Sequence, residues 1–139
     1  MRSSEQAGTG RDEQATARTP ESVRPHLQEI RAQLHSDREE TIARIAALGE
    51  NVSSIVEAAR YTATDDEHDP EGSTIAFERS QADALRSSGH QQLVEIEAAL
   101  ARIDDDAYGV CERCGQPIAH ERLLARPTAR TCITCATRR

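Results

Sequence analysis

Two long stretches of the chain carry apolar residues spaced mostly three and four positions apart, which places them on one face of an α-helix. The first stretch runs from about residue 23 to Ala63, or roughly 60 Å of helix. Asp37 and Thr41 interrupt its apolar stripe, which consists of Leu27, Ile30, Leu34, Ile45, Leu48, Val52, Ile55 and Ala59. This stretch predicts a long amphipathic helix.

The start of this helix has recognisable signals. Thr19 is a favourable N-cap residue, Pro20 suits the first helical position, and Glu21 suits the positive end of the helix dipole. Pro25 lies a little further in and has no N–H to donate. We therefore expect the regular helix to begin only around Val23.

The segment DDEHDPEGS, residues 65–73, breaks the helical pattern. Pro70 and Gly72 favour a turn, and Ser73 is a candidate cap for the helix that follows. The second helix weakens around residues 87–89 and is expected to end near Ala107, with Gly109 as its terminator. Its apolar stripe consists of Ile75, Ala82, Leu85, Leu93, Ile96, Leu100 and Ile103.

Two long amphipathic helices joined by a short turn predict an antiparallel coiled-coil hairpin, since neither helix buries its stripe alone. Aromatic residues make up only 2% of the chain, which argues against a compact aromatic-rich core. The predicted fold class is all-α. Pairing of the helices between two chains is the alternative to pairing within one.

Composition divides the chain into three parts. Residues 1–19 have no large apolar residue after Met1, so we expect a disordered tail. Residues 20–107 form the predicted hairpin and hold 19 acids and eight Arg, a net charge of −11. Residues 108–139 form a predicted C-terminal module with two acids and six Arg, a net charge of +4. An acidic arm suits a basic protein surface and is a poor ligand for DNA.

The C-terminal module contains all four cysteines of the chain, arranged as two CxxC pairs separated by 17 residues. Zinc takes four ligands in a tetrahedron, and a two-residue gap lets both sulfurs of a pair reach one ion. Gly115 follows the first pair directly and permits the left-handed backbone of such a turn. The spacing predicts one zinc ion bound by Cys111, Cys114, Cys132 and Cys135.

Redox, disulfide and iron–sulfur chemistry are the alternatives to zinc for these cysteines. A thioredoxin-like redox pair needs a βαβ context that the chain does not offer, and two disulfides need an oxidising compartment. An iron–sulfur cluster also uses four cysteines, and the spacing alone does not exclude it. His120 lies between the pairs and is a competing ligand, but four thiolates already complete the site.

The predicted zinc site is structural. A module of about 30 residues buries too little surface to fold by packing alone. Four protein ligands leave no position for a catalytic water, and no phosphate loop, Ser-His-Asp set or HExxH motif is present. We therefore expect that the protein is not an enzyme. No apolar run is long enough to span a bilayer and no signal-peptide core opens the chain, so we expect a cytoplasmic protein without a membrane partner.

The run YGVCERCGQPIAHERLLARPTARTCITC, residues 108–135, resembles the zinc finger of the DksA/TraR family of bacterial transcription regulators. The two cysteine pairs are in register with that signature. Positions around and between the pairs fit it as well, namely Tyr108, Gly109, Ile118, Arg122, Leu123, Ala125 and Pro127. The preceding hairpin matches the architecture of the family.

This resemblance implies a mechanism. Members of the family bind RNA polymerase directly and insert the hairpin tip into its secondary channel, which alters promoter complexes, in some members together with guanosine tetraphosphate. They read no DNA sequence. The tip motif of the family is Asp-x-x-Asp-x-Ala, which implicates Asp66 and Asp69; Glu71 stands at the alanine position here.

Two alternative functions remain from the sequence. Arg113 and Arg130 lie near the cysteines, and nearby cations favour reactive thiolates, so a thiol-based redox or zinc sensor is one. A coiled-coil adaptor that pairs with another protein is the other. Direct DNA binding is disfavoured because the module is only weakly basic and no basic recognition helix is evident.

Overall fold

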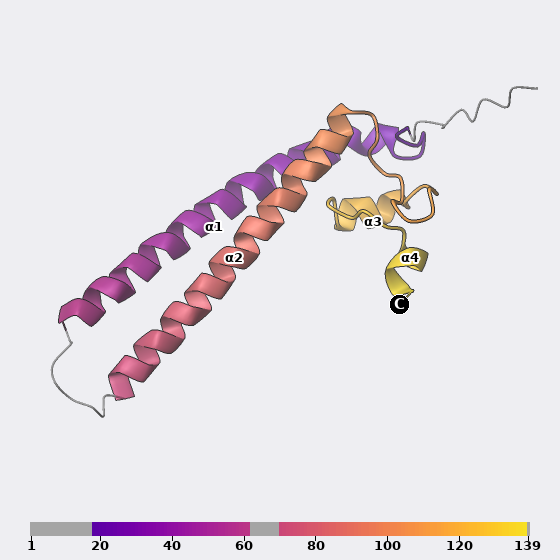
Figure 1. Cartoon of the computed structure of the whole chain (residues 1–139). Coiled ribbons are helices and arrows are strands. Elements are labelled where there is room, and N and C mark those ends of the chain that lie inside the picture. Colours follow the sequence, from indigo (N-terminus) through magenta and orange to yellow (C-terminus); the bar gives the residue numbers. More distant parts are fainter. Residues whose placement is uncertain (1–17, 62–69, 139) are drawn as a thin grey trace, which may run out of the picture.

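The computed structural model describes residues 18–61 and 70–138. Two helices of 35 residues each, α1 (Leu27–Tyr61) and α2 (Pro70–Asp104), run antiparallel along each other, with the C-terminal module beside one end (Figure 1). This arrangement confirms the predicted all-α hairpin with pairing inside one chain. Residues 1–17 of the predicted tail lie outside the described residues. So do residues 65–69 of the tip, the acidic segment DDEHDPEGS, and with them Asp66 and Asp69.

The first helix begins later than expected, and its predicted cap is wrong. Residues 20–23 form a turn in which the N–H of Val23 donates to the carbonyl of Pro20 at 2.9 Å. A short 3₁₀ turn, η1 (Arg24–His26), follows and contains Pro25. The α-helix starts only at Leu27 because a proline supplies no N–H for the helical ladder. The Thr19 side chain bonds elsewhere, at the junction with the C-terminal module.

The second helix begins at Pro70, so Pro70, Gly72 and Ser73 belong to its first turn and not to the preceding turn. Proline tolerates this position because the first N–H groups of a helix have no partner inside it. The helix ends at Asp104, three residues before the expected end.

The end of α2 is a Schellman motif built without glycine. The N–H of Ala107 donates to the carbonyl of Arg102 at 2.8 Å, and the N–H of Asp106 donates to that of Ile103 at 3.2 Å. Asp106 takes the left-handed conformation with φ of 53°. The predicted terminator, Gly109, lies beyond this motif.

The buried face between α1 and α2 follows the predicted stripe near the module. Ile30 and Leu34 of α1 face Ile96 and Ile103 of α2, and all four are buried. Leu85 differs from the prediction because 54% of it is exposed. Three small or polar residues extend the buried face instead: Thr41, Gly89 and Ala99.

Thr41 does not interrupt the stripe. It is only 1% exposed, and its hydroxyl donates to the carbonyl of Asp37 at 2.6 Å. A hydroxyl bonded to the carbonyl four residues earlier in its own helix is satisfied without water. Thr41 therefore occupies an interior position that an aliphatic residue would otherwise fill.

Gly89 is a close-contact position between the helices. A Cβ atom added there would lie 2.9 Å from Cγ1 of Ile45, a separation too short for two carbon atoms. The apolar stripe of α2 is therefore interrupted at Gly89 because the side chain of Ile45, on α1, lies close to the α2 backbone there.

Ion pairs and hydrogen bonds tie the two helices together along their exposed edges. Arg31 pairs with Asp104 at 2.9 Å, and Arg38 pairs with Glu97 at 3.3 Å. Such exposed pairs each contribute only about 0–1 kcal/mol. They fix the register of the helices more than they stabilise them.

The module contains two short helices, α3 (His120–Ala125) and α4 (Ile133–Thr137), and its core is continuous with that of the hairpin. Tyr108 is fully buried at the junction, in one cluster with Val23 and Ile103 on one side and Ile118 and Leu123 on the other. None of the described helices is both long and apolar enough to span a bilayer.

Candidate metal centre

The four cysteine sulfurs converge on one point. Every pair among Cys111, Cys114, Cys132 and Cys135 lies within 4.8 Å, and the sulfurs of Cys114 and Cys132 are 3.7 Å apart. Four ligands about 2.3 Å from a tetrahedral zinc would be separated by about 3.8 Å. The cysteines are free and not paired as disulfides. The geometry therefore fits one zinc ion with four thiolate ligands.

The backbone of the first pair forms a tight knuckle. The N–H of Gly115 donates to the carbonyl of Cys111, and the N–H of Cys111 donates to that of Gln116, both at 2.9 Å. Gly115 has a φ of +73°, as its place after Cys114 predicted. No atom lies within 4 Å of where its Cβ would be, so conformation and not space requires the glycine.

The second pair stands at the start of α4. Cys132 is the residue before the helix, and the N–H of Ala136 donates to its carbonyl at 2.9 Å. Cys135 lies within the helix one turn later, so both sulfurs point to the same side.

Two thiols of the cluster, those of Cys111 and Cys135, have pKa values shifted in opposite directions. Burial would raise the pKa of Cys111, but hydrogen bonds from the backbone of Cys132, Cys114 and Arg113 outweigh it and lower this pKa to about 6. Hydrogen bonding to the Cys132 side chain, with burial and the other two thiols, raises the pKa of Cys135 to about 12. The lowered pKa favours the thiolate of Cys111, which is the form that metals bind.

Arginine contacts hold the two knuckles together. The Arg113 guanidinium donates to the Cys135 carbonyl at 3.1 Å, and that of Arg122 donates to the Thr131 carbonyl at 2.9 Å. Arg130 pairs with Glu112 at 3.5 Å, while the Glu112 N–H donates to the Arg130 carbonyl at 2.9 Å. The guanidinium groups of Arg113 and Arg130 contact carbonyl and carboxylate oxygens. These contacts stabilise the loops that carry the cysteines.

His120 is not part of the metal site. The cluster of metal-binding side chains found among the described residues contains the four cysteines alone. The His120 ring instead stacks on that of His26, with centroids 4.7 Å apart and planes 6° from parallel. This stack joins the start of α3 to η1, ahead of the first long helix.

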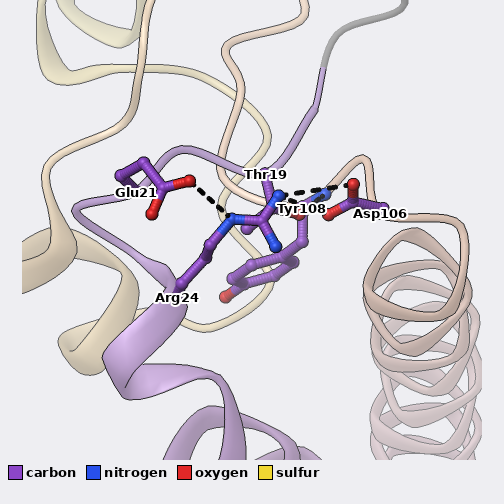
Figure 2. A network of polar contacts seen from close by, with 5 residues as sticks. All are labelled: Thr19, Glu21, Arg24, Asp106 and Tyr108. Atoms are coloured by element: carbon purple, nitrogen blue, oxygen red, sulfur yellow. Dashed lines mark hydrogen bonds and ion pairs between the residues drawn. The ribbon is translucent and has the colours of Figure 1, made fainter.

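A second set of contacts fastens the module to the hairpin. Thr19 is buried, its N–H donates to the Asp106 carbonyl at 2.9 Å, and its hydroxyl accepts from the N–H of Tyr108 at 3.1 Å (Figure 2). The Arg24 guanidinium reaches the Asp106 carboxylate at 3.3 Å. We call residues 19–26 the strap, because this segment crosses the end of α2 and touches the module.

Two positions of the sequence signature act at this junction. The Tyr108 hydroxyl donates to the Pro127 carbonyl at 2.7 Å, which ties the start of the module to its far loop. Gly109 has a φ of +87°, and a Cβ there would lie 3.1 Å from Val23 of the strap. Glycine is therefore required by both the backbone conformation and the close approach of the strap.

The other signature positions serve the interior of the module. Ile118 and Leu123 are buried in its core, and Arg122 holds the loop before Cys132. Ala125 ends α3, and Ala129, which the sequence did not single out, is also buried.

Comparison with known proteins agrees with this geometry. Residues 107–139 match the model of the prokaryotic dksA/traR C4-type zinc finger. The solved structure of the transcription factor DksA2 from Pseudomonas aeruginosa superposes with a TM-score of 0.69 and 26% identity, over 84% of this chain and 87% of that one. The zinc finger of this chain is therefore that of the DksA/TraR family.

Curated relatives match parts of the chain. The RNA polymerase-binding transcription factor DksA of Haemophilus influenzae is 44% identical over 52 residues, 37% of this chain and 36% of that protein. General stress protein 16O of Bacillus subtilis is 28% identical over 107 residues, 77% of this chain and 60% of that protein. The chain thus spans from about a third to three fifths of the length of these two relatives.

As in the C4-type finger of the family, the cofactor of this protein is one structural zinc ion, which Cys111, Cys114, Cys132 and Cys135 fit by number, type and distance. Four thiolates complete the tetrahedron, so the ion supplies folding free energy to the module and has no open position for a substrate.

Proposed function

We propose that this protein binds RNA polymerase directly and regulates initiation by placing the tip of its hairpin in the secondary channel of the enzyme. The observation that carries the proposal is the likeness to DksA2 over most of both chains, hairpin included. Two of the relatives, from Haemophilus influenzae and Salmonella typhimurium, carry the name RNA polymerase-binding transcription factor DksA.

The shape and charge of the hairpin support this role. Each long helix has 35 residues, or about 50 Å at 1.5 Å per residue, so the arm is long enough to enter a deep channel. Residues 20–107 carry a net charge of −11, which favours a basic or metal-containing destination. With this role, we propose that the protein is cytoplasmic and acts as a regulator without enzymatic activity of its own.

Asp66 and Asp69 are the residues that we propose to act at the tip. A double variant with Asp66→Asn and Asp69→Asn should bind purified polymerase about as tightly as wild type but lose most of its effect on initiation. The matched control carries Glu39→Gln and Glu40→Gln, which remove the same charge from exposed positions of α1. The control should keep both activities.

Binding to polymerase core and holoenzyme, followed by abortive initiation assays with and without guanosine tetraphosphate, tests the whole proposal. A wild-type protein with no affinity for either form of polymerase would refute it. A response that does not change when the nucleotide is added would restrict the proposal to a regulator that acts without it.

A redox-sensing role is a second candidate, and the exposure of the zinc site favours it. Cys114 is exposed, and its sulfur lies 3.7 Å from that of Cys132, so an oxidant reaching one sulfur has a neighbouring sulfur for disulfide formation. Release of zinc by mild peroxide, followed with a chromogenic chelator, tests this role. Release no faster than from an ordinary four-cysteine zinc finger would exclude it.

A further inference from the structure

An open pocket of about 420 Å³ lies on the module between the residues before α3 and helix α4. Its apolar lining consists of Pro117, Ala119 and Ile133, and its basic lining consists of Arg122 and Arg138. Three of the zinc ligands also border the pocket, so zinc binding fixes its shape.

Ile133 is the unusual residue of this pocket. It is 60% exposed, whereas Ile118 and Leu123 are buried in the module core. Pro117 and Ala119 are also exposed, so apolar atoms gather around a single hollow. A grouped apolar surface of this kind marks an interaction site more often than a lone exposed side chain does.

Apart from the cysteines that bind zinc, the charged side chains that line the pocket are basic. Neither acid of the module lines it: Glu112 pairs with Arg130, and Glu121 contacts His120. Arg122 is partly engaged by the Thr131 carbonyl, but Arg138 is exposed and has no ion-pair partner within the described part of the chain. The net charge of +4 on residues 108–139 falls only to about +2 when four thiolates bind zinc.

We propose that this pocket holds an acidic segment of RNA polymerase, with an aliphatic side chain against Ile133 and a carboxylate paired with Arg138. This inference rests on the proposed function and adds a second contact to it. The arm and the module have opposite charges, so they select opposite charges on the partner. A contact at the module would fix how deeply and in which orientation the hairpin is seated.

A second copy of the chain is a weaker occupant. Each chain has a net charge of −7, so two copies repel each other over most of their surface. A nucleic-acid backbone is weaker as well, because the hollow is lined mainly by apolar atoms and phosphate gains nothing from them.

The experiment measures binding of the zinc-loaded full chain to core polymerase free of nucleic acid. Ile133→Ser and Arg138→Glu should each weaken binding about fivefold or more, and the Arg138 variant should also show a smaller salt dependence. The controls are Val94→Ser, an exposed aliphatic position on α2, and Arg126→Glu, an exposed arginine of the same module outside the pocket. Both controls should bind within about twofold of wild type.

The outcomes separate the two proposals. If wild type binds and both pocket variants bind equally well with full zinc content, the pocket contact is wrong and the proposed function stands. If wild type does not bind, both are wrong. Should Ile133→Ser lose zinc, the pocket contact is judged from Arg138→Glu and Arg126→Glu alone. Equal binding by these two variants would then show that the pocket contact is wrong. A dimer of the free chain that Arg138→Glu dissociates would assign the pocket to a second copy and overturn the inference.

Discussion

The hydroxyl of Thr19 accepts a hydrogen bond of 3.1 Å from the backbone N–H of Tyr108, a residue 89 positions further along the chain. Both residues are buried at the point where the strap, the end of α2 and the zinc module meet (Figure 2). This bond gives the buried N–H of Tyr108 a partner that no regular secondary structure supplies.

Replacing Thr19 with valine should destabilise the protein by about 1–3 kcal/mol, because it leaves a buried N–H without an acceptor. Thr19→Ser keeps the oxygen and should cost clearly less. Urea unfolding of the zinc-loaded protein measures both changes in the free energy of unfolding. Equal losses for valine and serine would show that the hydrogen bond contributes little.

Tyr108 should make stability depend on pH in the alkaline range. Burial raises its pKa to about 12 in the folded protein, against about 10 when unfolded. The folded state holds this proton more tightly, so its contribution is complete below about pH 10 and is lost as the pH rises towards about 12.

Tyr108→Phe removes this titration and also the bond to the Pro127 carbonyl, which should cost about 0.5–1.5 kcal/mol near neutral pH. Between about pH 9 and pH 11.5, the wild type should therefore lose its advantage over the variant. A constant difference in the free energy of unfolding across this range would contradict the prediction.

Gly49 of α1 and Gly89 of α2 should respond to alanine in opposite directions. A Cβ at Gly89 meets Ile45 at 2.9 Å, so Gly89→Ala should destabilise the hairpin by about 1–3 kcal/mol. A Cβ at Gly49 meets only the flexible guanidinium end of Arg86, at 3.7 Å. Gly49→Ala should stabilise α1 by about 0.5–1 kcal/mol, since alanine is the better helix former.

Thermal unfolding of both alanine variants under the same conditions tests this pair. If Gly89→Ala is as stable as wild type, the close approach of Ile45 is not a feature of the molecule in solution.

Purified protein should contain one zinc per chain, and removing it should unfold the module while leaving most of the helix of α1 and α2. Cys114→Ser should lose zinc under mild chelation, because it removes one of four ligands. His120→Ala is the control and should keep the full zinc content, since His120 stacks on His26 and lies outside the ligand cluster.

Elemental analysis measures the zinc, and hydrogen exchange at the N–H groups of Cys111 and Gly115 reports on the first knuckle. A module that keeps these amides protected without metal would contradict the structural role of the ion.

Features that repeat locally along the chain could be predicted from the sequence. The spacing of apolar residues predicted the hairpin, and the CxxC spacing predicted the convergence of four sulfurs, because both follow from the geometry of a helix or a turn. Gly115 was correctly assigned the left-handed turn after Cys114 for the same reason.

Features that depend on a distant partner could not be predicted. Thr19 looked like a helix cap because the sequence does not reveal Tyr108 beside it. Thr41 and Gly89 looked like gaps in the stripes, yet the first is satisfied by its own helix and the second makes room for Ile45. Gly109 looked like a helix terminator, although Asp106 does that work and Gly109 accommodates the strap.

The interior that runs unbroken from Ile103 through Tyr108 to Leu123 bears on how this protein can be engineered. Neither the finger nor the arm is an interchangeable part, since each supplies a wall of the other's interior. A chimera that joins this finger to a foreign hairpin must also bring Val23 and its neighbours in the strap, or Tyr108 will face water.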